Sequence, residues 1–211
     1  MPHSTDALLA IDLQNDFMPG GALAVAGGDE VVPLVNRLAQ AFGHVVLTQD
    51  WHPAEHVSFA GNHPGRQPFE TVALAYGAQT LWPAHCVQGS RGAALHEGLQ
   101  ATLARARAIV RKGQNAALDS YSAFLEADRK TPTGLAGYLR DLGITRVFCC
   151  GLATDYCVAW SALDARAAGF EVALIEDASR AIDLNGSLAA AWQQLRAAGV
   201  ARVEAQEALR G

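Results

Sequence analysis

The chain has 211 residues, of which 50% are hydrophobic and 18% are charged, and its formal net charge at pH 7 is −5. This composition is ordinary for a globular protein, and we expect residues 1–211 to form a single domain. The acidic balance and the lack of a basic stripe argue against nucleic acid as a partner. A membrane-spanning helix is not expected either, because no apolar run approaches the roughly 20 residues it needs.

The amino terminus and the cysteines indicate a cytoplasmic protein. The opening sequence MPHSTDALLAIDLQNDF has no basic segment ahead of its apolar run, and Asp12 interrupts that run, so we expect no signal peptide. The cysteines, Cys86, Cys149, Cys150 and Cys157, form no CxxC pair. We therefore expect reduced thiols rather than a disulfide framework.

Short apolar runs alternate with helical patterns along the chain. The runs predict strands at residues 7–13, 44–50, 107–112, 146–151, 171–177 and 201–205, and the patterns between them predict helices at 29–42, 133–142, 155–168 and 186–198. Most of the runs are continuous rather than alternating, which is typical of strands buried on both faces of a parallel sheet. This order of elements predicts an α/β fold, a three-layer α/β/α sandwich.

Reactive side chains follow four of the predicted strands. Asp12, Asp50 and Lys112 end the first three strands, and Cys157 comes shortly after the fourth. In open α/β sheets, ligands bind outside the carboxyl ends of the strands, so we expect these groups to meet at one edge. The connection after the second strand is about fifty residues long and contains most of the histidines, which is typical of a functional loop.

Cys157 falls in the first turn of the helix predicted at 155–168. If Thr154 caps this helix, the positive end of the helix dipole lowers the pKa of the thiol. A buried cysteine is often only a small packing residue. The presence of Asp12 and Lys112 at the same edge instead favours a nucleophile, a proton acceptor and a cation that holds the acceptor in place.

Asp50 and His52 form a D-x-H pair, and on an extended segment their side chains point the same way. His85, in the stretch LWPAHC, supplies a third ligand and leaves positions open for water. Two imidazoles and one carboxylate suit a divalent ion, with Zn²⁺ as the first expectation and Fe²⁺ or Mn²⁺ as alternatives. His56 is a candidate fourth ligand, although a position in an outer layer or on the surface is favoured for it.

Five motifs together resemble the nicotinamidase branch of the isochorismatase-like cysteine hydrolase superfamily. They are AIDLQNDFMPGGALAV, TQDWHPAEHVSFA, LWPAHCVQGS, RKGQNAALDSYSAF and GLATDYCVAWSALDA, and they occur in the family's order from about residue 7 to 180. The resemblance implies a six-stranded parallel sheet with the strand order 3-2-1-4-5-6.

The resemblance also implies roles for single residues. These are a catalytic triad of Asp12, Lys112 and Cys157, the metal ligands Asp50, His52 and His85, and the pyridine-binding residues Phe17, Trp82 and Tyr121. A cis peptide bond is implied between Leu152 and Ala153. It turns the amides of Ala153 and Cys157 into an oxyanion hole.

The implied activity is hydrolysis of nicotinamide to nicotinate and ammonia through a thioester on Cys157, as part of NAD salvage. A metal ion orients the ring, no organic cofactor takes part, and pyrazinamide is an expected second substrate. One alternative is a different hydrolase of the superfamily, such as an N-carbamoyl hydrolase or an isochorismatase. Isochorismatases proper lack the D-x-H…H set, which favours the nicotinamidase branch.

A second alternative is a non-enzymatic binding domain of the same fold, for which the whole triad would have to be a coincidence. The oligomeric state stays open in the sequence. The last fifteen residues are rich in Ala and Glu, and they either cap the sheet or contact another copy of the chain in a homo-oligomer.

Overall fold

The computed structural model describes residues 1–210 of the chain. Its central sheet consists of β1 (Asp6–Ile11), β2 (His44–Asp50), β5 (Ala106–Lys112), β6 (Arg146–Leu152), β7 (Glu171–Arg180) and β8 (Ala201–Val203). All adjacent strands are parallel, and their order is β5-β2-β1-β6-β7-β8. Counted along the chain, this is the expected order 3-2-1-4-5-6, so the predicted fold class is confirmed.

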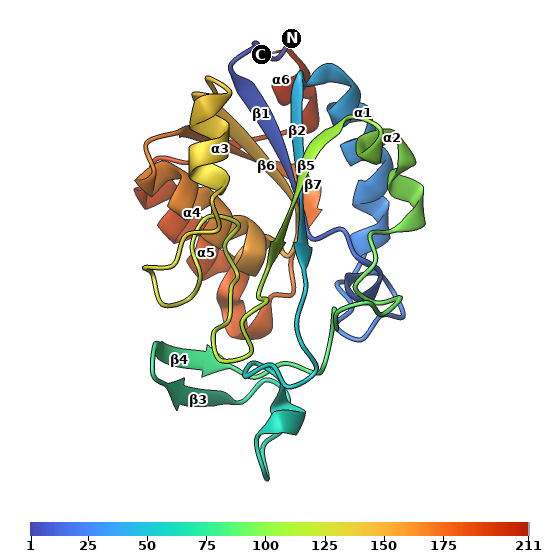
Figure 1. Cartoon of the computed structure of the whole chain (residues 1–211). Coiled ribbons are helices and arrows are strands. Elements are labelled where there is room, and N and C mark those ends of the chain that lie inside the picture. Colours follow the sequence, from blue (N-terminus) through green and yellow to red (C-terminus); the bar gives the residue numbers. More distant parts are fainter. Residues whose placement is uncertain (211) are drawn as a thin grey trace.

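Helices cover both faces of the sheet (Figure 1). One face carries α1 (Val32–Ala41), α2 (Gln100–Leu103) and α6 (Ala205–Arg210), and the other carries α3 (Leu135–Asp141), α4 (Ala159–Ala167) and α5 (Ser187–Ala197). Within β1, Leu8 packs into the first of these cores and Leu9 into the second. This alternation is what a strand buried on both faces produces. None of the helices in residues 1–210 is long and apolar enough to cross a membrane.

Three features of the fold lie outside the predicted strands and helices. β3 (Thr71–Leu74) and β4 (Gly77–Thr80) form an antiparallel hairpin in the long connection, beyond the carboxyl ends of the parallel strands (Figure 1). The short helix α2 precedes β5. The third feature, α6, packs against α1 and β7, so the alanine-rich end of the chain caps the sheet.

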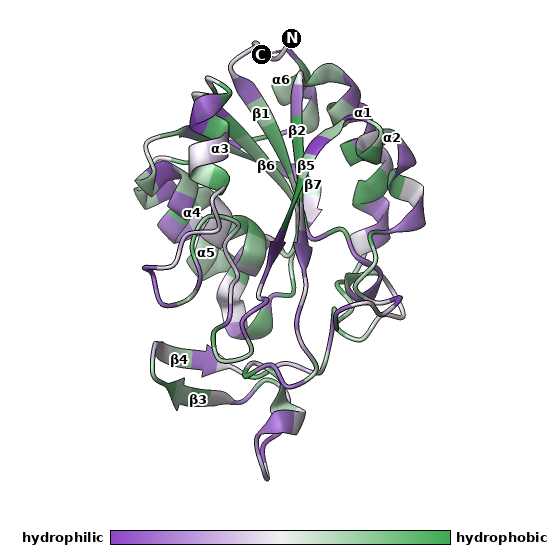
Figure 2. Ribbon diagram, in the orientation of Figure 1, coloured by the Kyte–Doolittle hydropathy of each residue, from purple (hydrophilic) through white to green (hydrophobic). Residues whose placement is uncertain are grey.

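The hydropathy of the strands marks where the site lies. Figure 2 shows strands that are hydrophobic along most of their length, whereas the carboxyl ends of β2 and β5 are hydrophilic. Asp50 and Lys112 are the last residues of these two strands, and both are buried. Charged side chains are rarely buried unless they are paired. The fold therefore brings buried charges together at one edge of an otherwise apolar sheet.

A buried ion pair joins β1 to β6 at the opposite edge. Asp6 is only 1% exposed and accepts hydrogen bonds from Arg146 Nε at 2.9 Å, Arg146 Nη2 at 2.7 Å and the His3 amide at 2.7 Å. Burial raises the pKa of Asp6, but the Arg146 and His3 interactions outweigh burial and lower the pKa below its ordinary value of 3.8. The ionised carboxylate thus stabilises the fold above that pH, and this stabilisation is lost as the pH falls through the folded-state pKa.

We predict that Asp6→Asn lowers the free energy of unfolding at pH 7 by about 1–3 kcal/mol, because it removes charge-assisted hydrogen bonds from a buried position. The difference from the wild type should shrink as the pH falls below 3.8. Urea unfolding at a series of pH values measures both effects. A difference that is absent at pH 7, or that stays constant into strong acid, would contradict this role.

Candidate active site

Asp12 directly follows β1 and is completely buried. Its backbone φ is 50°, in the left-handed region that Asp tolerates better than most residues. Thr48 on β2 holds it from both ends: the Thr48 hydroxyl donates to Asp12 Oδ1 at 2.6 Å and accepts from the Asp12 amide at 3.1 Å. Thr48 therefore fixes the orientation of this carboxylate. Thr48 is not among the site residues predicted from the sequence.

Lys112 joins the other polar groups of the site. Its Nζ lies 2.8 Å from Asp12 Oδ2 and forms an ion pair with Asp50 Oδ1. It also donates to the Ser120 carbonyl oxygen at 3.1 Å and lies 3.4 Å from Cys157 Sγ. Burial by itself would lower the pKa of Lys112, but the carboxylates of Asp12 and Asp50 outweigh burial and raise the pKa well above its usual value. The lysine is therefore a permanent cation.

The two carboxylates beside Lys112 differ in their acidity. Burial raises the pKa of Asp12 above its ordinary value, and the nearby ammonium only partly offsets this effect. Burial acts on Asp50 in the same direction, but the Lys112 cation, together with the nearby His52 and His85 rings, outweighs burial and holds the pKa of Asp50 well below its usual range. Asp50 therefore stays ionised, whereas Asp12 accepts a proton more readily.

Cys157 lies in a π-helical turn, Thr154–Val158, that joins β6 to α4. Ala153 precedes this turn and no side chain caps it, so the expected cap by Thr154 is wrong. Burial raises the pKa of the Cys157 thiol well above its usual value, although the Lys112 cation opposes the shift. The expected lowering of the thiol pKa is also wrong, because desolvation of the buried thiolate outweighs the effect of the Lys112 cation. The resting thiol is protonated.

A proton acceptor lies within reach of this thiol. One oxygen of Asp12, one oxygen of Asp50 and Cys157 Sγ are all within 4.8 Å of one another. The structure thus brings the three candidate triad residues to the edge of the sheet where the sequence analysis expects them. The peptide bond between Leu152 and Ala153 is cis, as expected, and Ala153 lines the same pocket as Cys157.

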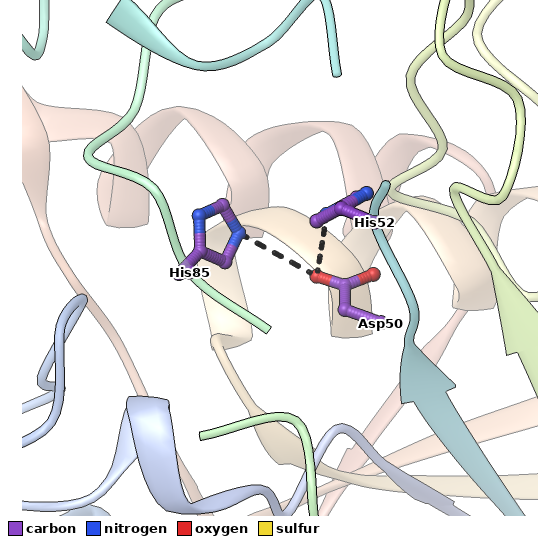
Figure 3. A group of neighbouring side chains, drawn as sticks. All are labelled: Asp50, His52 and His85. Atoms are coloured by element: carbon purple, nitrogen blue, oxygen red, sulfur yellow. Dashed lines mark ion pairs between the residues drawn. The ribbon is translucent and has the colours of Figure 1, made fainter. Parts of the chain in front are cut away.

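Asp50, His52 and His85 converge beside the triad. Figure 3 shows both rings directed at one carboxylate oxygen: Asp50 Oδ2 is 3.6 Å from His52 Nε2 and 3.8 Å from His85 Nε2. The other ring nitrogens are held by backbone carbonyls, since His52 Nδ1 is 2.9 Å from Gly113 O and His85 Nδ1 is 2.8 Å from Pro83 O. A carbonyl oxygen only accepts, so in each neutral ring Nδ1 donates and Nε2 keeps its lone pair.

This donor set fits a divalent metal ion. The three ligand atoms lie within 4.8 Å of one another, and metal-binding histidines usually donate their other ring N–H to a carbonyl or carboxylate. Two nitrogens and one oxygen suit Zn²⁺, Fe²⁺ or Mn²⁺. Gly113 is part of the arrangement, because a Cβ there would lie 2.3 Å from the His52 ring and its φ is +64°.

His56 is completely buried behind His52, with the two ring centroids 4.1 Å apart, so the surface position considered for it is wrong. Its Nδ1 is 2.7 Å from Ser58 Oγ and its Nε2 is 3.2 Å from the Leu118 carbonyl oxygen. Burial and the neighbouring His52 lower the pKa of His56 to about 4, so the ring is neutral. His52, His56 and Asp119 also lie close enough to share an ion, but hydrogen bonds engage both nitrogens of His56.

One pocket is lined by the thiol of Cys157 and by the rings of His52 and His85. The three expected ring-binding residues, Phe17, Trp82 and Tyr121, all line it, and so do Leu23, Asp119, Tyr156 and Ile182, which the sequence analysis does not single out. The walls are mutually fixed: Trp82 Nε1 donates to the Tyr121 hydroxyl at 3.0 Å, and the Tyr156 ring meets Trp82 edge-on with centroids 4.9 Å apart. A narrow aromatic pocket of this kind suits one flat ring.

Two polar residues hold the backbone around the candidate metal ligands. The Gln14 side chain bonds both the amide and the carbonyl of Asp50 at 2.7 Å, and Asp16 Oδ2 accepts from the Cys86 amide at 2.7 Å, next to His85. Both residues follow Asp12 at intervals of two. The sequence shows this spacing, but it does not show the hydrogen-bond partners of Gln14 and Asp16, because Asp50 and Cys86 lie far along the chain.

Comparisons with known proteins agree with this geometry. The isochorismatase domain family matches residues 6–207. The nicotinamidase of Acinetobacter baylyi is 55% identical over 96% of this chain and 94% of its own length. A solved nicotinamidase and pyrazinamidase structure from Acinetobacter baumanii superposes with a TM-score of 0.96 at 54% identity, covering 98% of this chain and 99% of that one.

A pyrazinamidase of Pyrococcus horikoshii, solved in complex with zinc, superposes with a TM-score of 0.75 at 35% identity and covers 95% of this chain and 99% of its own. The family match spans nearly the whole chain, and the relatives match it over nearly their whole length. The chain therefore belongs to the isochorismatase family, in the branch that contains these nicotinamidases and pyrazinamidases.

Proposed function

We propose that the chain hydrolyses nicotinamide to nicotinate and ammonia, in the manner of its nicotinamidase relatives, and that it also accepts pyrazinamide. The observation that carries this proposal is a single pocket whose aromatic walls lead to both Cys157 and the Asp50, His52 and His85 cluster. A generic amide hydrolase of this fold needs the thiol but not the histidine pair. A binding domain without catalytic activity would not account for Lys112, which is enclosed between two carboxylates and a thiol.

Substrate binding uses the aromatic walls. We assign Phe17 and Trp82 to the two faces of the pyridine ring and Tyr121 to the wall beside it, with the carboxamide directed at Cys157. Asp50, His52 and His85 would hold a divalent ion, zinc by preference, and such an ion supplies a Lewis acid that orients the ring nitrogen. His56 then serves as an outer-layer residue that supports the His52 ring.

Asp12 activates the thiol. Asp12 takes the proton from Cys157 Sγ, and the thiolate attacks the amide carbon. We assign the amides of Ala153 and Cys157 to the oxyanion that forms, a type of contact worth about 3–4 kcal/mol in other enzymes. Asp12 then passes its proton to the leaving nitrogen, so ammonia departs and a thioester remains on Cys157.

Hydrolysis of the thioester regenerates the site. Asp12 removes a proton from water, the resulting hydroxide attacks the thioester carbon, and the C–S bond breaks to release nicotinic acid, which loses its proton to solvent and becomes nicotinate. The proton held by Asp12 returns to the sulfur. Lys112 stabilises each anion in turn, because its Nζ is 2.8 Å from Asp12 Oδ2 and 3.4 Å from Cys157 Sγ.

We also propose that residues 1–211 act as one domain and that the chain works in the cytoplasm. The six parallel strands form one continuous sheet, which supports a single domain. All four cysteines are free and buried, which supports a reducing compartment.

We predict that Cys157→Ala abolishes ammonia release from nicotinamide but leaves nicotinamide binding by calorimetry nearly unchanged, because the walls that hold the ring remain. In the wild type, brief iodoacetamide treatment should label Cys157 first, since it is 6% exposed and lines the pocket, whereas Cys86, Cys149 and Cys150 are 0% exposed. Peptide mapping identifies the labelled thiol. Preferential labelling of another cysteine would contradict the assignment of the nucleophile.

We predict that Asp12→Asn lowers kcat by roughly 10²–10⁴, because it removes the group that both accepts and returns the proton. Thr48→Val offers a matched control: it keeps the carboxylate but removes the hydroxyl that orients it, so its loss should be smaller, and Thr48→Ser should restore activity. Lys112→Ala should be severe as well. Steady-state ammonia release measures all four variants, and near wild-type turnover by Asp12→Asn would overturn the proposed base.

We predict that removal of bound divalent metal by a chelator strongly reduces nicotinamide turnover while iodoacetamide still labels Cys157. His52→Ala and His85→Ala should reproduce the loss in both activity and metal content, whereas His56→Ala should be milder. Benzamide, which lacks the ring nitrogen, should be a much poorer substrate of the metal-loaded enzyme. Atomic emission spectroscopy gives the metal content. Full turnover by protein with far less than one metal ion per chain would remove the metal from the proposal.

A further inference from the structure

Asp155 is a buried carboxylate beside the candidate nucleophile, and the reaction described above does not use it. It is 6% exposed and lies in the π-helical turn with Cys157. It accepts hydrogen bonds from the Ile182 amide at 3.0 Å, the Asp183 amide at 2.8 Å and the Ser187 hydroxyl. All three donors lie between the end of β7 and the first residue of α5, so one carboxylate anchors a segment that is distant in sequence.

The anchored segment has an unfavourable backbone of its own. Asp183, Asn185 and Gly186 all have left-handed φ angles, of 53°, 53° and 81°, and all three residues are exposed. Residues other than glycine adopt this backbone conformation at a cost in free energy. The conformation persists where surrounding contacts hold the backbone in place. The hydrogen bonds to Asp155 are charge-assisted and therefore stronger than bonds between neutral groups.

The same segment carries one wall of the pocket. Ile182 lines the pocket together with Tyr156 and Cys157, and it packs against the adjoining hydrophobic core. Tyr156, directly after Asp155, meets the Trp82 ring edge-on. One short turn thus supplies the thiol, an aromatic wall and the anchor of an aliphatic wall.

We propose that Asp155 is a positioning residue that sets the width of the ring pocket by holding Ile182 in place. The substrates admitted are then flat aromatic amides whose ring carries no substituent on the edge that meets Ile182. This inference rests on the proposed function, because it concerns the pocket in which nicotinamide is taken to bind. A fixed apolar wall discriminates against one additional methyl group by roughly 10- to 200-fold, and a wall that can move gives up that discrimination.

The test compares nicotinamide with its 5-methyl and 6-methyl derivatives, using metal-loaded Asp155→Ala enzyme. For at least one derivative, kcat/KM relative to nicotinamide should rise about tenfold or more, and KM for nicotinamide should rise more than kcat falls. Ile182→Ala should give the same change in substrate preference. The double variant should add little to it, because both substitutions act through one wall.

Asp183→Asn is the matched control. It changes a carboxylate of the same segment, whose Oδ1 accepts from the Leu188 amide at 3.2 Å, and Asn tolerates the left-handed backbone. Its substrate preference should equal that of the wild type. If Asp155→Ala does not fold, Asp155→Asn replaces it in the test. Asn keeps the shape of the side chain but places an amide N–H₂ against the hydrogen-bond donors, so the substrate preference should shift in the same direction.

A second measurement does not depend on turnover. The ratio of Cys157 alkylation rates with N-phenylmaleimide and iodoacetamide should rise in Asp155→Ala and stay unchanged in Asp183→Asn. Both reagents consume the same thiolate, so the ratio reports access and not ionisation. Unchanged substrate and alkylation ratios, with only a uniform loss of activity or a lower unfolding temperature, would overturn the inference. A wild-type enzyme that hydrolyses no nicotinamide would instead refute the proposed function, and the alkylation ratio would still test the wall.

Discussion

The rest of the site depends on the ion pairs that the buried ammonium of Lys112 forms with the carboxylates of Asp12 and Asp50. Two carboxylates with oxygens within 4.8 Å of each other would repel one another in a site closed to water, and one buried cation compensates both. Asp12 faces the thiol and Asp50 faces the histidines. The candidate catalytic half and the candidate metal half of the site therefore share a single counter-ion and are electrostatically coupled.

The groups that react are held in place from outside the pocket. Thr48 orients Asp12, the carbonyl oxygen of Gly113 orients His52, and Gln14 fixes the backbone of Asp50. Such supporting contacts reduce the reorganisation that a reaction requires. The three residues lie within three positions of the carboxyl ends of β2, β5 and β1. The pocket walls come from a different source. They are contributed by the connections that follow β1, β2, β5 and β7 and by the turn before α4.

Burial accounts for the sequence-based expectations that fail. A thiol in the first turn of a helix has a lowered pKa in water, but Cys157 lies in a closed pocket where desolvation dominates. The sequence around His56 does not distinguish it from an exposed loop histidine, yet its ring is enclosed between His52 and the Leu118 carbonyl. Neither environment is encoded by nearby residues. In both cases the neighbours that decide the outcome come from other parts of the chain.

The sequence by itself determined the six strands, because each is a local apolar run, and the resemblance carried by five motifs determined their order. It also determined which side chains could ligate a metal ion together. Residues spaced by two on an extended segment, such as Asp50 and His52, point to the same side of that segment. Only the tertiary structure decided that Lys112 serves both acids, that carbonyl oxygens fix the tautomers of His52 and His85, and that Asp155 anchors the segment of Ile182. Such contacts join residues far apart in the chain, and they form only when the parallel sheet brings the carboxyl ends of its strands to a common edge.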